Sequence, residues 1–275
     1  MTVQTLGPEG RSASVGAGYA ALVEPEDLPR HPLVEAVFEF KWKLSGGDAQ
    51  APTDPDYKLL VGSLFDRIRE RYPTHEEQPA ASIPDQFVPQ IIQHRFKADS
   101  GYPIVQLGPG IFAVNETVRY SWATYKPTVM DALADLRATY RGTLTIDSIV
   151  LRYINAIPFD PAEQDSIAYV RDNLNVDVVL PPGLLADRPV TGHPQAFAFQ
   201  VNYQLTDPAG VMALKIADGR SNDQPSLIWE ISVQSGGEDV PDLGHVETWL
   251  DRAHAIARAW FFTVIAGRLE AEYRS

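Results

Sequence analysis

Apolar and charged residues alternate most regularly over residues 34–44. The alternation predicts a β-strand, because successive side chains of a strand point to opposite faces. The apolar positions are Val34, Ala36, Phe38, Phe40 and Trp42. Glu35, Glu39 and Lys41 fall on the other face, where Val37 also lies. The strand therefore has one face for a core and one face that carries charge.

A second alternating strand is predicted over residues 145–157, and it places Arg152 between Val150 and Ile154 on one face. A partly buried guanidinium requires a charged or multiply hydrogen-bonded partner. Glu35 or Glu39, from the corresponding place in the earlier strand, is the natural partner. We expect an internal ion pair that fixes two halves of the chain together. A ligand-binding arginine is the alternative.

Apolar residues at intervals of three and four predict the helices, and shorter alternating runs predict the remaining strands. The predicted helices are residues 54–72, 126–140, 160–174 and 241–273. The predicted strands are residues 86–97, 104–107, 111–115, 120–123, 176–180, 196–206, 211–217 and 227–234.

Strands in adjacent runs favour an α+β fold with a mainly antiparallel sheet and helices packed on one face. The order of elements repeats, which predicts two tandem β-α-β(n)-α halves at residues 30–143 and 144–275. The second half ends in a long amphipathic helix. Residues 1–29 show no sustained period and are expected to be a flexible N-terminal arm. The order is analogous to saddle-shaped folds of the TATA-binding-protein type, an analogy that carries no function.

Composition narrows the classes of function. The chain has 275 residues, a formal net charge of −13 and no cysteine. The acidic field disfavours nucleic acid as the main partner. The lack of cysteine excludes thiolate metal sites, disulfides and a cysteine nucleophile. We expect a cytoplasmic protein, because no apolar run reaches the length of a membrane span and the N-terminus lacks the pattern of a signal peptide.

No strong catalytic motif is present. The P-loop, the Gly-x-Ser-x-Gly elbow and the His-Glu-x-x-His pair are all missing, and the six histidines have no metal-ligand spacing. We therefore expect no cofactor and no metal. Glu39-Phe40-Lys41 partly matches the Glu-x-Glu-x-Lys strand of triphosphate tunnel enzymes, but Val37 stands where the first acid is needed. A metal-dependent enzyme acting on phosphate-bearing substrates, with Glu35, Glu39, Lys41 and Arg152 in its pocket, stays as the alternative.

Four sequence blocks carry a resemblance to a known family. They are PLVEAVFE from Pro32, VQLGPGIFAVN from Val105, YSW from Tyr120 and LRYIN from Leu151. The chain resembles, from about Leu28 onward, a sporadically distributed and uncharacterised bacterial protein family of similar length. That distribution implies carriage on mobile or defence-associated loci. The family supplies no catalytic residues.

These observations favour a non-catalytic binding or assembly subunit over an enzyme. Its partner is expected to be another protein or a second copy of the chain, with no membrane. The binding surface is expected on a polar sheet face or in a groove between the halves, and a nucleic-acid-binding saddle is a further alternative. The candidate binding residues are Glu35, Glu39, Gln106, Asn115, Tyr120, Trp122, Arg152, Tyr153 and Asn155. Tyrosine and tryptophan suit interfaces because they join apolar area to a polar group, although Tyr120 and Trp122 could equally be core residues.

Overall fold

A computed structural model describes residues 28–46, 51–117, 119–184, 189 and 194–275. Most of the predicted N-terminal arm lies outside these residues. The described part forms one antiparallel sheet of nine strands in the order β2-β3-β4-β5-β1-β6-β9-β8-β7. The predicted α+β class and the mainly antiparallel sheet are confirmed.

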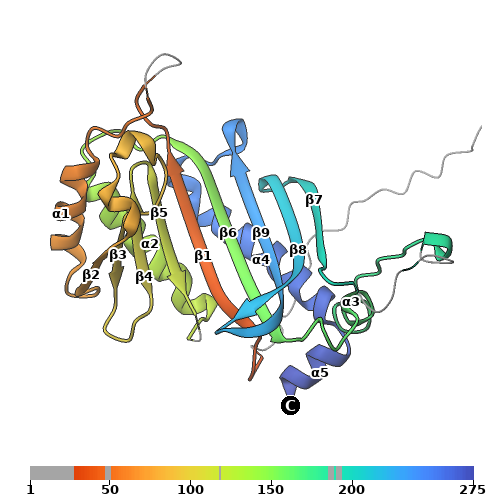
Figure 1. Cartoon of the computed structure of the whole chain (residues 1–275). Helices are drawn as coiled ribbons and strands as arrows, with labels where there is room; N and C mark the ends of the chain where they lie inside the picture. Colours follow the sequence, from red (N-terminus) through yellow and green to blue (C-terminus); the bar gives the residue numbers. More distant parts are fainter. Residues whose placement is uncertain (1–27, 47–50, 118, 185–188, 190–193) are drawn as a thin grey trace, which may run out of the picture.

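The strands form a sheet that extends across the molecule from β2 on the left to β7 on the right (Figure 1). Their bounds are β1 Leu33–Trp42, β2 Thr74–Glu77, β3 His94–Lys97, β4 Ile104–Gly108, β5 Ile111–Glu116, β6 Ile146–Pro158, β7 Ala198–Thr206, β8 Ala209–Ser221 and β9 Gln224–Gly236.

Figure 1 shows α2 and α4 behind the sheet, on one of its faces. The α-helices of the described residues are α1 Tyr57–Ile68, α2 Trp122–Thr139, α3 Ser166–Leu174, α4 Val246–Ile265 and α5 Arg268–Arg274. Single 3-10 turns occur at Pro79–Ser82, Asp85–Phe87, Pro182–Leu184, Gly237–Asp239 and Leu243–His245. None of the helices among these residues is long and apolar enough to cross a membrane.

The centre of the sheet is the antiparallel pair of β1 and β6. Phe38 lies opposite Leu151, and Val37 lies opposite Arg152. β5 pairs with the other edge of β1, and β9 pairs with the other edge of β6. The two alternating strands recognised in the sequence are therefore neighbours, and their charged faces point to the same side.

The hydrophobic core lies between the sheet and the helices. On β1 the fully buried side chains are Ala36, Phe38, Phe40 and Trp42, as the alternation predicts. On α4 the buried stripe includes Trp249, Leu250, Ala253 and Ala257. Burying a large apolar side chain contributes about 1.5–3 kcal/mol, so this face supplies most of the stability. α1 is held to α2 by Asp135, whose carboxylate accepts hydrogen bonds from Arg67 at 2.6 Å and from Arg71.

The strand predicted over residues 86–97 is wrong for most of its length, and only His94–Lys97 is a strand. The preceding residues form a 3-10 turn and then pass close to β4. A Cβ atom on Gly108 would lie 2.0 Å from the carbonyl oxygen of Ile91, so this crossing requires glycine. β2 is an additional strand that the pattern did not predict, because the sequence Thr-His-Glu-Glu has no apolar alternation.

The predicted strand at residues 120–123 is the start of a helix instead. Ser121 caps α2, since its hydroxyl accepts a hydrogen bond from the Thr124 amide at 3.3 Å. Because α2 begins at Trp122 rather than at residue 126, Pro127 lies inside the helix and not at its start. Its missing N–H removes one intrahelical bond near the first turn, which the helix tolerates.

Two further boundaries differ in the second part of the chain. Residues 176–180 are irregular rather than a strand, and α3 begins at Ser166, where Asp165 accepts hydrogen bonds from two backbone amides. The long C-terminal helix is divided into α4 and α5 at Gly267, whose φ of +96° is outside the helical region. The spacing of apolar residues continues past Gly267, so the sequence predicted one helix where the structure has two.

Candidate functional site

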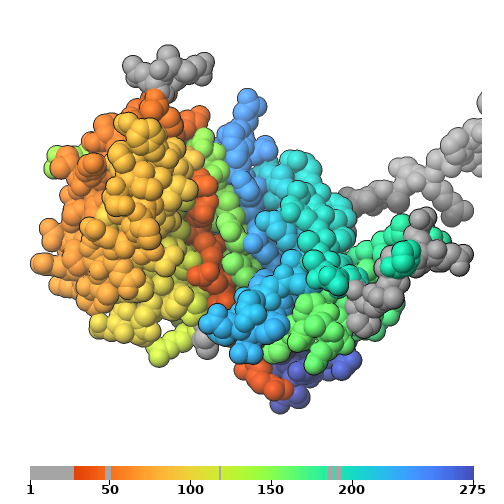
Figure 2. Space-filling view, viewed as in Figure 1, coloured from red at the N-terminus to blue at the C-terminus, as the bar shows by residue number. Residues whose placement is uncertain are grey.

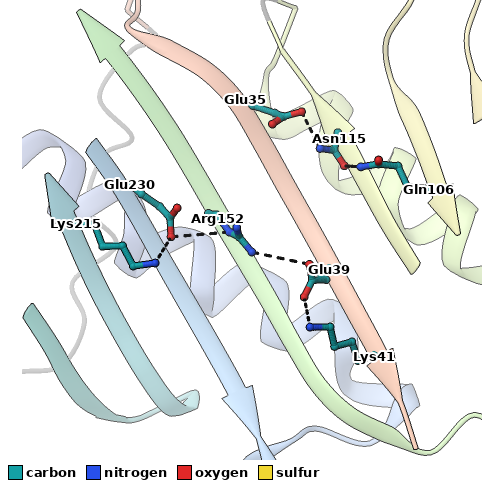
Figure 3. A network of polar contacts seen from close by, with 8 residues as sticks. All are labelled: Glu35, Glu39, Lys41, Gln106, Asn115, Arg152, Lys215 and Glu230. Carbon is teal, nitrogen blue, oxygen red and sulfur yellow. Dashed lines mark hydrogen bonds and ion pairs between the residues drawn. The ribbon is translucent and has the colours of Figure 1, made fainter. Parts of the chain in front are cut away.

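A row of alternating charges crosses the helix-free face of the sheet at its centre (Figure 3). Arg152 on β6 lies between two carboxylates, with Nη2 3.9 Å from Glu39 on β1 and Nε 4.0 Å from Glu230 on β9. Lys41 contacts Glu39 at 3.0 Å, and Lys215 on β8 contacts Glu230 at 3.2 Å. The expected pairing of Arg152 with Glu39 is therefore present.

A second polar row continues from β1 toward β3. Glu35 accepts a hydrogen bond from the Asn115 amide at 2.8 Å, and Asn115 accepts one from Gln106 at 2.7 Å. Gln106 in turn accepts a bond from Arg95 at 2.8 Å. Glu35 thus bonds to an amide rather than to Arg152. Five of the predicted site residues, Glu35, Glu39, Gln106, Asn115 and Arg152, lie on this one face (Figure 3).

The charges of the two rows compensate one another. The basic side chains of the face contact acceptors within it, including Lys97 on β3, which lies 2.7 Å from Glu76 on β2. Gln106 and Asn115 are buried although no helix covers them. In Figure 2, β1 and β6 lie at the floor of a hollow, with β2–β5 on one side of it and β7–β9 on the other. The result is a shallow polar surface with little net charge in a strongly acidic chain.

The sheet ends at β7 within the described part of the chain. Gln200, Asn202 and Gln204 lie on the same side as Lys215, because Gln200 is the register partner of Lys215. On the opposite side of β7, Tyr203 is 56% exposed and meets Trp260 of α4 edge to face, with ring centroids 5.6 Å apart. The polar face therefore continues to an edge strand whose other side is apolar.

The remaining predicted site residues lie on the opposite face of the sheet, against α4. The Tyr120 hydroxyl donates to the Tyr153 hydroxyl at 3.0 Å, and the Tyr153 hydroxyl is 2.8 Å from Nδ1 of His254. Trp122 stacks on His254 with ring centroids 3.9 Å apart. Asn155 is almost fully buried two residues along β6 from Tyr153. The sheet thus separates the nine predicted residues into two groups that cannot act on one ligand.

His254 is the functional candidate that the sequence analysis missed. Burial and, as the smaller cause, the positive charge of Arg258 together lower the pKa of His254 to about 3. The imidazole is therefore neutral at physiological pH. The Tyr153 hydroxyl and Nδ1 of His254 share one hydrogen bond, and the tautomer of the ring decides which of the two groups donates. A histidine inside an apolar helical stripe, beside Ala253 and Ala257, is the signal that was available in the sequence.

A second histidine cluster lies at the other end of the sheet. Nε2 of His75 on β2 is 3.0 Å from Nδ1 of His94 on β3. Burial lowers the pKa of His94, and the neighbouring His75 adds to the effect. A cavity of about 500 Å³ lies beside His94, next to Tyr57 and Asp85. In the described residues no three His, Asp or Glu side chains are grouped closely enough to hold a metal ion.

Comparison with known proteins gives no assignment. No family model matches the chain, and no curated protein is significantly similar to it.

Proposed function

We propose that this chain is a non-catalytic assembly subunit that pairs with a second copy of itself through β7. The observation that carries the proposal is the character of this edge strand. β7 spans nine residues, Ala198–Thr206, and contains no charge, no proline and no glycine. Natural proteins usually protect a sheet edge with short strands, charges or prolines, since an open edge pairs with other chains.

The opposite edge of the sheet shows this protection. β2 has only four residues, two of them glutamates, and Pro73 and Pro79 flank it. Glu76 also contacts Lys97 on the neighbouring strand. One sheet therefore has one edge that resists pairing and one edge that permits it, which supports a specific role for β7 in assembly.

The sequence of β7 is self-complementary when two copies pair antiparallel about Asn202. Phe199 then lies opposite Leu205, and Val201 lies opposite Tyr203, both on the helix side of the sheet. On the polar side Gln200 lies opposite Gln204, and Asn202 lies opposite its own copy. Such a two-fold interface places each residue beside a compatible one, as symmetric dimers require.

Charge favours this site for self-association. Two chains of net charge −13 repel one another at long range, so contact is easiest where no charge is brought together. β7 is uncharged, and the exposed Tyr203 would lose solvent contact in the pair. Pairing would also join the two polar faces into one continuous surface, on which a further protein partner can bind.

The alternatives have less support. An enzyme acting on phosphate-bearing substrates needs Glu35, Glu39 and Arg152 to converge on a pocket, whereas Glu35 bonds Asn115 and Glu39 contacts Arg152 and Lys41. A nucleic-acid saddle needs basic side chains that can reach phosphates. The lysines and arginines of the polar face instead contact acceptors on the same face.

Two parts of the proposal rest on the sequence. The order of elements, β1-α1 through α2 and then β6-α3 through α4, supports two halves built on one plan, with β1 and β6 as corresponding strands. The resemblance to the sporadically distributed bacterial family supports the further proposal that the subunit belongs to a defence or mobile-element system. Affinity capture from the native host, followed by identification of the bound protein, tests this second part.

A single cysteine tests the pairing directly, because the chain has no cysteine of its own. In an antiparallel pair, directly opposite Cα atoms are about 4.5–5.5 Å apart, which lies within the range of a disulfide. Asn202→Cys should therefore form a covalent dimer under mild oxidation, seen on a non-reducing gel at twice the mass of the 30.4 kDa chain.

Gln200→Cys is the matched control for register. Its copy would lie four residues away along the strand, about 13 Å at 3.3 Å per residue, so it should not cross-link. Asn202→Lys should convert the dimer to a monomer in sedimentation, and Gln234→Lys, on the same face of the interior strand β9, should leave it dimeric. A wild-type chain that sediments as a monomer at every concentration would refute the proposal.

A further inference from the structure

A small cavity lies on the helix-covered face of the sheet, between β6 and α4, with a volume of about 110 Å³. Most of its wall is apolar, and the apolar lining includes Leu33 of β1, Ile231 of β9 and Phe261 of α4. The cavity is half open to solvent, so its volume does not limit the length of a molecule that enters it. It is separate from β7 and from the polar face of the sheet.

An asparagine interrupts the apolar row that β6 directs into the core. Leu151, Tyr153, Asn155 and Ile157 follow one another along this face of the strand, and all four are buried. Asn155 is 1% exposed and lines the cavity, and its Nδ2 has no hydrogen-bond partner. Most buried polar groups are paired, because an unpaired one has lost its water without a replacement. The amide is thus a donor for which the described residues supply no acceptor.

A second unpaired donor lies on the neighbouring strand. Asn155 is the register partner of Trp229 in β9, whose indole Nε1 is buried and also lacks a partner. An amide nitrogen and an indole nitrogen only donate hydrogen bonds, so the missing groups are acceptors whatever tautomers the nearby histidines adopt. An oxygen atom bound next to Asn155 would supply an acceptor.

Most other polar groups of the lining are engaged with groups of the protein. The Tyr120 hydroxyl contacts the Tyr153 hydroxyl at 3.0 Å, and the Tyr153 hydroxyl is 2.8 Å from Nδ1 of His254. Arg258 lies over the Phe262 ring and has a further interaction, so it is not a free charge. A carboxylate that enters a mainly apolar cavity loses its water at far greater cost than a neutral carbonyl does. The site therefore favours an uncharged acceptor.

We infer that this cavity binds an uncharged, mainly apolar molecule through a carbonyl oxygen, as in a ketone or an ester. The Asn155 amide donates a hydrogen bond to that oxygen, and the hydrocarbon part lies against Leu33, Ile231 and Phe261. Burial of apolar surface supplies most of the affinity. The hydrogen bond selects the carbonyl compound over a hydrocarbon of the same shape.

Three probes of similar shape test the inference on the full-length chain. Acetophenone carries a neutral carbonyl, ethylbenzene lacks the oxygen, and benzoate carries a charge in its place. Ligand-detected NMR should give acceptophenone-type binding that saturates, with an affinity for acetophenone about tenfold higher than for ethylbenzene or benzoate. Acetophenone should also shift the side-chain amide pair of Asn155, which is identified by its loss in Asn155→Leu.

Asn155→Leu is the decisive variant, since it keeps the branched shape of the side chain and removes the donor. It should bind acetophenone about tenfold more weakly and ethylbenzene as well as the wild type does. Phe261→Ala, at a partly buried position, is a second test if Asn155→Leu does not fold, and it should weaken the binding of both probes. Phe87→Ala is its matched control, because Phe87 is 70% exposed and lies outside the cavity, and it should bind both probes as the wild type does.

Three results would overturn the inference. No binding of acetophenone up to its solubility limit would show that the cavity holds only water or nothing. Equal acetophenone affinity in the wild type, Asn155→Leu and Phe261→Ala would place the bound ketone elsewhere. Benzoate binding as tight as that of acetophenone would show that the site does not select an uncharged acceptor. None of these results bears on the β7 dimer, which is measured by cross-linking and mass alone.

Discussion

Phe38 and Glu39 are neighbours in β1, yet they belong to surfaces that are held together in different ways. Phe38 packs among apolar and aromatic side chains between the sheet and the helices. Glu39 lies on the open face in a row of ion pairs with Arg152 and Lys41. Dispersion and burial stabilise the first surface in proportion to its area. The second gains less from its charges, since its ion pairs are still partly exposed and solvent-exposed pairs contribute only about 0–1 kcal/mol.

The comparison indicates a division of roles. The covered face carries the stability of the fold, so its residues are constrained by packing. The open face is not needed for folding stability, because the covered face supplies it. The side chains of the open face can therefore be selected for binding to other molecules. The following three predictions test this division, from the largest effect to the smallest.

Phe38→Ala should lower the free energy of unfolding by about 3–5 kcal/mol, because it removes a fully buried ring and leaves a cavity. Val37→Ala, one residue away on the helix-free face, should cost only about 1–2 kcal/mol, because Val37 is also buried but loses two methyl groups rather than a ring. Urea denaturation of both variants measures the difference. Equal losses of unfolding free energy would show that the open face is also a core, and the proposed division of roles between the two faces would be wrong.

The second prediction concerns the pH dependence of the covered face. Folded His254 has its pKa lowered to about 3 by burial and by Arg258, whereas the unfolded residue titrates near pH 6.5. Between these values the unfolded chain binds more protons, so stability falls as the pH falls. The slope due to His254 is about 1.4 kcal/mol per pH unit, and its contribution is complete above pH 6.5.

The difference between the wild type and His254→Gln isolates this slope, because His94 and the carboxylates titrate in both proteins. Denaturation at a series of pH values from 7 to 4 should show the wild type losing its stability more steeply than the variant. Parallel curves for the two proteins would mean that His254 takes up its proton at the same pH in the folded and the unfolded chain, and that its lowered pKa is wrong.

The smallest effects are expected along the charged row. Arg152→Met should cost about 1–2 kcal/mol, because Glu39 on β1 and Glu230 on β9 both lose the cation that lies between them. Lys215→Ala, at the exposed end of the row, should cost less than about 1 kcal/mol. A double-mutant cycle of Arg152→Met with Glu230→Gln measures their coupling. A coupling of several kcal/mol between Arg152 and Glu230 would show that the charged row stabilises the fold, and the view that it serves only as a binding surface would be wrong.

The sequence predicted the parts of the fold that repeat regularly. The alternation over residues 34–44 identified β1 and both of its faces. The isolated arginine in β6 indicated a partner in Glu35 or Glu39, and the structure selects Glu39. Such inferences succeed because the buried side of a strand or helix requires apolar residues at regular intervals in the sequence. The stripe of α4 was recognised for the same reason, although Gly267 divides the predicted helix.

Other features, such as β2 and the division of the candidate site, have no regular pattern of apolar residues that could predict them. β2 is held by pairing with β3 and not by its own composition, so Thr74–Glu77 could not be recognised. The division of the candidate site also depends on tertiary geometry. Arg152 and Tyr153 are adjacent in sequence and were grouped as one site, but adjacent strand residues point to opposite faces. Tyr153 and Asn155 lie on one face of β6 by the same periodicity, whereas their neighbour His254 comes from a helix 101 residues later in the chain than Tyr153.

The central position of β1 has a consequence for how the protein is made. β1 is the first described strand to leave the ribosome, yet both of its neighbours, β5 and β6, begin after residue 110. At about 5–20 residues per second, β1 waits roughly 4–14 s for its first partner. Throughout that time Phe38, Phe40 and Trp42 are exposed on an unpaired strand. Glu35, Glu39 and Lys41 interrupt this apolar run and act as gatekeepers against aggregation, so charges that add little to the finished fold protect the nascent chain.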